Sequence, residues 1–234
     1  MTRAESIAEG LAGVRARIAA AERAGGRAPG SVKLLAVSKK MPPDDVRAAI
    51  TAGQRAFGEN YAQELRDKRA ALAAEPAAPQ WHYIGPLQSN KVKYVAGQVA
   101  LIHTVDSVAL LEAIAARGMP QACLVQVNVA GEAQKRGVAP TDLPALLDRF
   151  AALPNVTCAG LMLIPPLTED PGDARPHFAA LRALRDREIG HRRSNVDLRE
   201  LSMGMSGDLE AAIAEGATIV RVGTAIFGAR RPVG

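Results

Sequence analysis

The sequence predicts an α/β fold, a single (β/α)8 TIM barrel spanning residues 1–234, with one extra helix at its N-terminus. Eight short apolar runs alternate along the chain with stretches of helical periodicity, as a series of βα units requires. Most of these runs are apolar on both faces, which is typical of strands buried in a parallel sheet. The length of 234 residues fits such a barrel, which has about 250, better than two separate cores.

Residues 1–25 are expected to form an amphipathic helix packed on the barrel. Thr2 and Glu5 have the spacing of a capping box, in which each side chain accepts from the other's backbone. The segment lacks the apolar core of a secretory signal, and no apolar run approaches 18 residues. We therefore expect a soluble, cytoplasmic protein without a membrane anchor. The apolar residues at helical spacing are Ile7, Leu11, Val14 and Ile18.

The eight strands are expected at the apolar runs, which are residues 34–38, 55–58, 81–84, 99–103, 122–129, 156–164, 198–202 and 218–222. Helices are expected between them wherever start signals precede an apolar stripe. These helices are expected at 43–52, at 61–68, after Ser107, after Thr141, at 178–189 with Ile189 on the apolar stripe, and at 208–215. Eight units favour a closed barrel over an open doubly wound sheet.

The composition argues against several classes of protein. Aromatic residues make up only 3% of the chain, too few for the platforms on which single-stranded nucleic acid stacks. The net charge of +5 comes from dispersed cations, so we expect no nucleic-acid partner. The densest basic group is interpreted as a solvated helix face, with a phosphate-contacting surface as the alternative. It consists of Arg182, Arg185, Arg187, Arg192 and Arg193.

The cysteines and histidines provide no metal site. The chain has two cysteines, Cys123 and Cys158, too few for a disulfide framework or a thiolate-rich metal site. Both lie in apolar runs, which favours a reducing compartment. The four histidines have no ligand spacing, so we predict no metal. The chain also lacks a GxGxxG or Walker A motif for nucleotides.

The turns after the last two predicted strands have the composition of a phosphate site. A (β/α)8 barrel commonly binds phosphate there, at the carboxyl ends of its strands. Gly204, Gly207 and Gly223 would allow close backbone approach, and Ser206 and Thr224 would add hydroxyl donors. Ser206 is also placed to cap the helix at 208–215, whose dipole favours an anion. The alternative is that these residues only form tight turns and a cap.

Three side chains could carry chemistry. Lys39 ends the first strand beside Lys40, and a desolvated lysine next to a cation has a lowered pKa and can attack an aldehyde. The alternative is two solvated lysines. Arg221 is expected to share a strand face with Ile219 and so to need a buried acceptor. That acceptor is either an acidic side chain or the ring nitrogen of pyridoxal phosphate. His82 is either a packed core histidine or a catalytic residue.

Five motifs resemble the pyridoxal phosphate homeostasis proteins, also called the YggS/PROSC family. They occur in the family's order and span nearly the whole chain. The motifs are LLAVSK at 34–39, FGENY at 57–61, WHYIGPLQSNK at 81–91, LSMGMS at 201–206 and VRVGTAIFGAR at 220–230. The resemblance implies the barrel of the alanine racemase N-terminal domain and the vitamin B6 cofactor pyridoxal 5'-phosphate (PLP).

The same resemblance implies roles for individual residues. PLP is expected as a covalent aldimine on Lys39, with Arg221 facing the pyridine nitrogen. Lys135, within residues 132–137, matches a family lysine with a part in cofactor release. The sequence departs from the family where Lys40-Met41-Pro42-Pro43 replaces Thr-Lys-Pro, which moves the second lysine one place closer. The other implied cofactor-binding residues are Asn60 and His82 beside the ring, Ser206, Gly207, Gly223 and Thr224 around the phosphate, and Ser202 and Met203.

The resemblance implies a monomeric carrier that buffers PLP, maintains intracellular PLP and amino-acid homeostasis, supplies apo-enzymes and has no efficient catalysis of its own. The alternative is a PLP-dependent amino-acid racemase, which in the similar barrel enzyme needs a tyrosine base from a separate C-terminal domain. We expect no such domain, because the chain ends soon after the eighth unit. An arginine at the ring nitrogen also weakens the electron sink, which disfavours transamination. A third possibility is an aldolase that uses a Schiff base. Such an enzyme would place its lysine on a late strand, whereas Lys39 follows the first strand, so the sequence gives this possibility little support.

Overall fold

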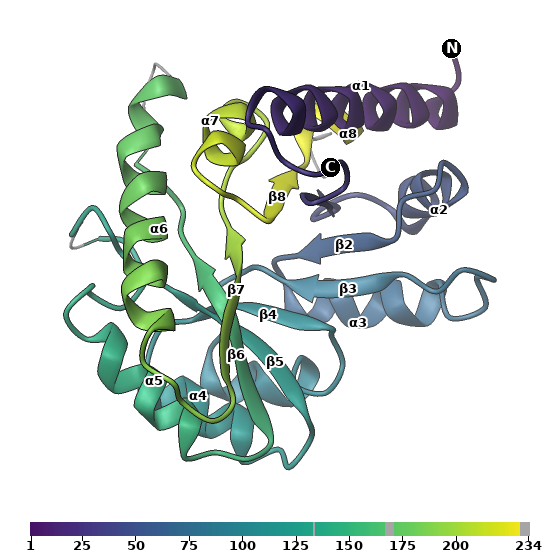
Figure 1. The fold of residues 1–234 in the computed structure, drawn as a ribbon. Coiled ribbons are helices and arrows are strands. Elements are labelled where there is room, and N and C mark those ends of the chain that lie inside the picture. Colours follow the sequence, from purple (N-terminus) through teal and green to yellow (C-terminus); the bar gives the residue numbers. More distant parts are fainter. Residues whose placement is uncertain (133, 167–170, 230–234) are drawn as a thin grey trace.

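The computed structural model describes residues 1–132, 134–166 and 171–229, and it contains a closed barrel of eight strands surrounded by helices (Figure 1). The strands are β1 (Lys33–Val37), β2 (Ala56–Glu59), β3 (Gln80–Tyr83), β4 (Leu101–Val105), β5 (Gln121–Gln126), β6 (Val156–Met162), β7 (Val196–Ser202) and β8 (Ile219–Val222). They pair in parallel and in sequence order, and β8 closes the barrel against β1. The predicted fold class is confirmed, and each predicted strand overlaps an observed one.

The helices lie around the outside of the barrel, most of them between successive strands. They are α1 (Arg3–Ala24), α2 (Pro43–Thr51), α3 (Ala62–Ala71), α4 (Val108–Ala115), α5 (Leu143–Ala151), α6 (Arg175–Ile189), α7 (Leu209–Ala214) and α8 (Thr224–Phe227). Two 3₁₀ segments, η1 (Ser89–Tyr94) and η2 (Pro171–Ala174), complete the series. No described helix combines the length and apolar character that crossing a lipid bilayer requires.

Two apolar clusters fill the molecule. The larger one lies between the strands and the surrounding helices. The smaller one fills the inside of the barrel and consists of Leu35, Leu101, Leu124, Met162 and Ile219. Arg221 follows Ile219 by two residues on β8, so both side chains point inward, as the strand period predicted. The inside of the barrel is therefore apolar around Ile219 and polar nearer the carboxyl ends of the strands.

Helix α1 packs across α2, α7 and α8 (Figure 1). Its predicted capping box between Thr2 and Glu5 is present, and its four predicted apolar residues are buried. A Cβ at Gly10 would lie 2.8 Å from the carbonyl oxygens of Ala225 and Ile226, so α1 crosses α8 at backbone contact distance. Arg17 reaches from α1 to α7, where it pairs with Glu210 at 2.6 Å. The extra helix thus fixes the two short helices that follow β7 and β8.

Two local predictions were wrong, the cap formed by Ser206 and the burial of Ile189. Ser206 does not cap α7, because Asp208 occupies the N-cap position and its carboxylate accepts from the Met205 N–H instead. The helix expected after Thr141 is present as α5, with Asp142 at its N-cap position. Ile189 is 55% exposed, and Glu188 takes the buried position on that face of α6. Ala133 and Arg230, which fall within stretches identified in the sequence, lie outside the described residues.

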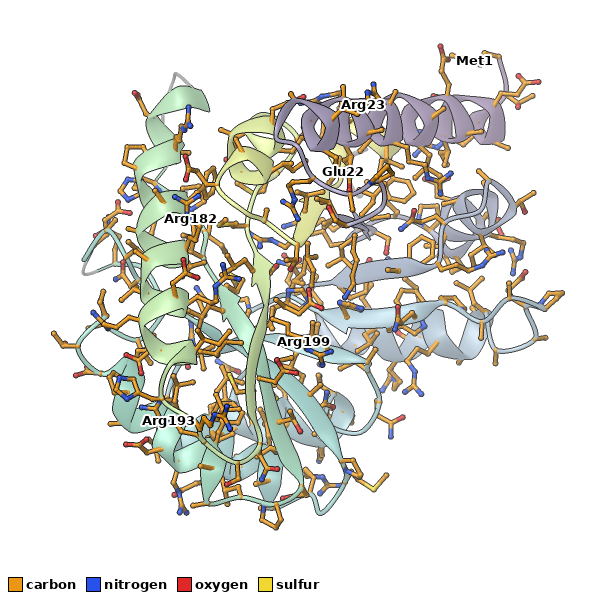
Figure 2. All side chains as sticks on the ribbon, in the orientation of Figure 1. Met1, Glu22, Arg23, Arg182, Arg193 and Arg199 are labelled. Atoms are coloured by element: carbon orange, nitrogen blue, oxygen red, sulfur yellow. The ribbon has the colours of Figure 1, made fainter. Side chains whose placement is uncertain are left out.

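The basic group on and after α6 is largely paired with acids. Arg182 projects from α6 on the side of α7 (Figure 2) and contacts Glu215 at 2.9 Å. Arg193 contacts Asp148 at 2.5 Å and Glu188 at 3.2 Å. These contacts favour the solvated helix face over a phosphate-contacting surface, because four of the five guanidinium groups have a carboxylate beside them, namely those of Arg182, Arg185, Arg187 and Arg193.

Candidate functional site

A cavity of about 300 Å³ lies at the carboxyl ends of the strands, where barrels of this class carry their functional groups. The residues predicted to bind a cofactor that line it are Lys39, Asn60, Ser206, Gly207, Arg221, Gly223 and Thr224. The lining residues that the sequence did not single out are Val37, Met41, Ile84, Ile164, Met205 and Gly228. The cavity thus combines an amine, a guanidinium and several neutral donors with an apolar wall.

Lys39 enters the cavity from a tight turn at the end of β1. The Met41 N–H donates to the Ser38 carbonyl oxygen at 3.0 Å, which closes a four-residue turn around Lys39 and Lys40. Lys40 has a φ of 62°, the left-handed conformation that one turn type requires at its third residue. Lys40 is exposed and does not line the cavity. Only the first of the two adjacent lysines therefore faces the site.

Asn60 is held at the cavity wall through its backbone. A Cβ at Gly85 would overlap the carbonyl group of Asn60, so only glycine permits this approach. The Tyr83 hydroxyl donates to the Asn60 carbonyl oxygen at 3.1 Å, and burial raises the pKa of Tyr83 to about 12. The Asn60 Oδ1 atom is buried and has no hydrogen-bond partner among the described residues. A buried acceptor left in this state calls for a polar ligand.

The loops after β7 and β8 meet at one side of the cavity. Gly204 has a φ of 92°, and a Cβ there would lie 2.6 Å from the Ala212 Cβ. Arg17 donates to the Ser206 carbonyl oxygen at 3.0 Å and holds the first loop from outside. A Cβ at Gly207 would meet no protein atom within 4 Å, so the backbone there is open to a ligand. With the Ser206 and Thr224 hydroxyls, these loops have the donors that bind a phosphate group.

Arg221 lies on the inner face of β8 at the floor of the cavity. Its guanidinium donates to Ser202 Oγ at 2.8 Å and to the Leu163 carbonyl oxygen at 2.9 Å. Burial lowers its pKa to about 10, while the charge of Asp208 acts in the opposite direction. No carboxylate within the described ranges forms an ion pair with it, so the acidic-partner alternative is not observed. A guanidinium has five N–H donors, which leaves donors for a bound group.

Beneath Arg221, a hydrogen-bonded chain continues through the inside of the barrel. Ser202 Oγ lies 2.9 Å from His103 Nδ1, and His103 Nε2 lies 2.9 Å from His82 Nδ1. Because arginine only donates, Ser202 Oγ accepts a hydrogen bond from Arg221. Its own hydroxyl can then donate a hydrogen bond to His103 Nδ1. Burial lowers the pKa of His82 to about 4 and holds the pKa of His103 well below its usual range. Both imidazoles are therefore neutral at pH 7.

Three of the residues predicted to bind the cofactor lie apart from the cavity wall. His82, Ser202 and Met203 do not line the cavity. His82 and Ser202 reach it only through Arg221, because their strands place them deeper in the barrel. Met203 is fully buried and packs in the outer apolar core. His103, which the sequence did not single out, links them, and its position two residues after the inward-facing Leu101 was the available signal.

Lys135 also lies apart from the cavity. Its Nζ contacts Glu132 at 2.6 Å within the loop that follows β5, and it is not among the described lining residues. The predicted role in cofactor release therefore receives no geometric support from the cavity wall.

Comparisons with known proteins agree on one family. The family model described as alanine racemase, N-terminal domain, matches residues 13–231. The pyridoxal phosphate homeostasis protein of Pseudomonas aeruginosa is 49% identical over 231 residues, which cover 96% of each chain. That of Aquifex aeolicus is 47% identical, over 95% of this chain and 98% of its own. The structure of PipY from Synechococcus elongatus, solved with PLP bound, has a TM-score of 0.81 at 40% identity and covers 95% of this chain and 100% of PipY.

Proposed function

The chain belongs to the family of the pyridoxal phosphate homeostasis proteins, and from that premise we propose that it binds PLP in the cavity at the carboxyl ends of its strands. One observation carries the proposal, namely that a lysine amine and a set of anion-binding donors line the same cavity. PLP has an aldehyde and a phosphate ester carried on neighbouring carbons of one pyridine ring, so it needs both kinds of group within one cavity. The cavity of about 300 Å³ lies at the lower end of the usual range for small-molecule sites.

Each part of PLP has a candidate partner among the lining residues. The Lys39 amine would condense with the aldehyde carbon, forming a carbon–nitrogen bond with release of water. The donors of Ser206, Gly207, Gly223 and Thr224 suit the phosphate dianion. Arg221 would face the ring nitrogen and keep it unprotonated, because two adjacent cations repel.

The buried chain beneath Arg221 supports this assignment. Ser202 and the Leu163 carbonyl fix two guanidinium donors, and the neutral His103 lets Ser202 act as an acceptor toward Arg221. His82 and Ser202 would therefore act on the cofactor only through Arg221, as positioning residues. The buried Asn60 Oδ1, which has no partner among the described residues, would lie beside the ring, where a hydrogen-bond donor on the bound cofactor would satisfy it.

We propose that the protein carries and buffers PLP and has no efficient catalysis of its own. Bound PLP stabilises negative charge that develops on the carbon of an attached amino acid. Racemisation needs a base on each face of that carbon. Among the described residues of the lining, Lys39 is the only side chain suited to be such a base, because the guanidinium of Arg221 stays protonated and only donates hydrogen bonds. The alternative of an amino-acid racemase thus lacks its second base here.

The proposal extends to the setting in which the protein works. A covalent bond to Lys39 would keep the reactive aldehyde from stray amines, and its hydrolysis would return PLP for transfer. We infer that the recipients are apo forms of PLP-dependent enzymes and that the protein acts as a cytoplasmic monomer. The reducing compartment agrees with two fully buried free thiols, Cys123 and Cys158.

The experiment is a spectroscopic titration of the purified protein with PLP. Wild-type protein should gain the absorption band of PLP bound through a protonated carbon–nitrogen double bond, and Lys39→Ala should not. Lys40→Ala is the matched control, since Lys40 is adjacent but exposed, and it should retain the band. A band that persists in Lys39→Ala would contradict the proposal. Formation of D-alanine from L-alanine at about 1 per second or faster, ordinary for an enzyme, would favour the racemase.

A further inference from the structure

Helix α3 holds the two peptide groups that flank Lys39. On one side, Lys68 Nζ donates to the Ser38 carbonyl oxygen at 2.5 Å. On the other side, the Lys40 N–H donates to Glu64 Oε1, also at 2.5 Å. Lys39 therefore emerges from a backbone segment that is fixed immediately before and immediately after it.

Glu64 and Lys68 also hold each other in place. They are four residues apart on α3, and Lys68 Nζ contacts Glu64 Oε1 at 2.7 Å. A third contact of Lys68 Nζ, at 2.7 Å, goes to Glu59 Oε1, which also accepts from the Ser38 hydroxyl at 2.6 Å. An ammonium group has three donors, so these contacts use all of them. The Lys68 side chain is only 3% exposed.

The backbone conformation of the turn after β1 explains why these contacts are needed. Lys40 has a φ of 62°, which non-glycine residues adopt only when surrounding structure holds them there. The bond from Glu64 acts on the N–H of this residue. A buried ion pair contributes little to stability compared with apolar packing, so stability alone does not account for a lysine enclosed by two carboxylates at this position.

We propose that Glu64 and Lys68 are positioning residues for Lys39: they fix the turn after β1 so that its amine points into the cavity. This inference rests on the proposed function, because the group that Lys39 is positioned toward is the aldehyde of PLP. Fixing a nucleophile beforehand raises the rate at which it attacks a bound partner, and small displacements lower that rate strongly. Neither residue touches the cavity itself.

The test compares substitutions at Glu64, whose side chain is 22% exposed and so tolerates change better than Lys68. Glu64→Ala removes the acceptor of the Lys40 N–H, whereas Glu64→Gln retains an oxygen at that place. Asp67→Ala is the matched control, because Asp67 lies on the same helix, is 65% exposed and, within the described part of the chain, pairs only with Arg66. Circular dichroism at the assay temperature confirms that each variant is folded.

The main readout is the rate at which the absorption band appears after mixing with PLP. Glu64→Ala should be slower than wild type by about tenfold, with Glu64→Gln and Asp67→Ala within about twofold of wild type. Wild-type rates in Glu64→Ala would overturn the inference. So would equal slowing in Glu64→Ala and Glu64→Gln, or equal slowing in Asp67→Ala. Absence of the band in wild-type protein would instead contradict the proposed function.

A second readout needs no cofactor. Amide hydrogen exchange of Lys40 in the cofactor-free protein should be slow in wild type and Glu64→Gln and at least about tenfold faster in Glu64→Ala, because the exposed turn then loses its only described acceptor for that N–H. Equal exchange in wild type and Glu64→Ala would overturn the inference, whatever the behaviour with PLP.

Discussion

His82 and His103 share a hydrogen bond of 2.9 Å, between Nδ1 of the first and Nε2 of the second, inside the barrel. His103 continues through Ser202 to Arg221, so the pair connects the interior of the barrel with the floor of the cavity. The arrangement requires neutral imidazoles, because protonation would place further positive charge beside a buried guanidinium. Burial and the charge of Arg221 accordingly lower the pKa of His103.

This pair predicts loss of stability in mild acid. The pKa of His82 is about 4 in the folded protein and about 6.5 in an unfolded chain. The unfolded state therefore binds more protons between these values, and the free energy of unfolding falls as the pH falls through that window. His82 should contribute a loss of about 2 kcal/mol between pH 7 and pH 5. Urea unfolding at pH 7 and at pH 5 measures this difference in the free energy of unfolding.

His82→Gln provides the control for that measurement. It removes the titrating group and should reduce the difference between pH 7 and pH 5. The carboxylates with lowered pKa values, Glu22, Glu200 and Glu210, lose their contributions below about pH 4.5, outside this window. An equal pH dependence in wild type and His82→Gln would show that His82 titrates normally in the folded protein.

Gly85→Ala should destabilise the protein by about 2–3 kcal/mol. The added Cβ overlaps the backbone of Asn60, which cannot move aside as a flexible side chain would. Gly13→Ala is the matched control, because Gly13 lies within α1 and a Cβ there meets nothing within 4 Å. That control should stabilise the protein by about 0.5–1 kcal/mol. Chemical unfolding measures the free energy of unfolding of both variants. Equal values in the two variants would contradict the close approach of Gly85 to the Asn60 backbone.

Arg221→Gln should weaken PLP binding. PLP carries a dianionic phosphate, and the substitution removes the positive charge that lies buried at the floor of the cavity. We expect the dissociation constant to rise by about tenfold, which corresponds to about 1.4 kcal/mol. Lys40→Gln removes an exposed cation outside the cavity, where solvent screens the charge, and should change the constant little. Absorbance titrations measure both, and equal constants in the two variants would argue against a role for Arg221.

The strand pattern and the N-terminal capping box were predictable because they depend on residues close together in the sequence. The position of Lys39 followed in the same way from the end of an apolar run. The depth of His82 in the barrel was not predictable, since it depends on how β3, β4, β7 and β8 pair. The error at Ser206 arose because the helix begins two residues later than its spacing suggested, with Asp208 at the N-cap position.

The contacts of Lys68 illustrate the same limit. Its spacing of four from Glu64 is visible in the sequence and is common on exposed helices. Its burial depends on the turn after β1, some 30 residues earlier in the chain. The spacing of Glu64 and Lys68 alone therefore suggests an exposed pair. The folded barrel buries Lys68 against the turn that carries Lys39.

The central claim is a covalent bond between PLP and the amine of Lys39. Borohydride reduction of the PLP-loaded protein makes such a bond permanent, and mass spectrometry of its peptides then locates the added group. We predict one PLP per chain, on the peptide that contains Lys39. Modification at Lys40, Lys135 or another lysine, or unmodified protein that still retains PLP, would contradict the account.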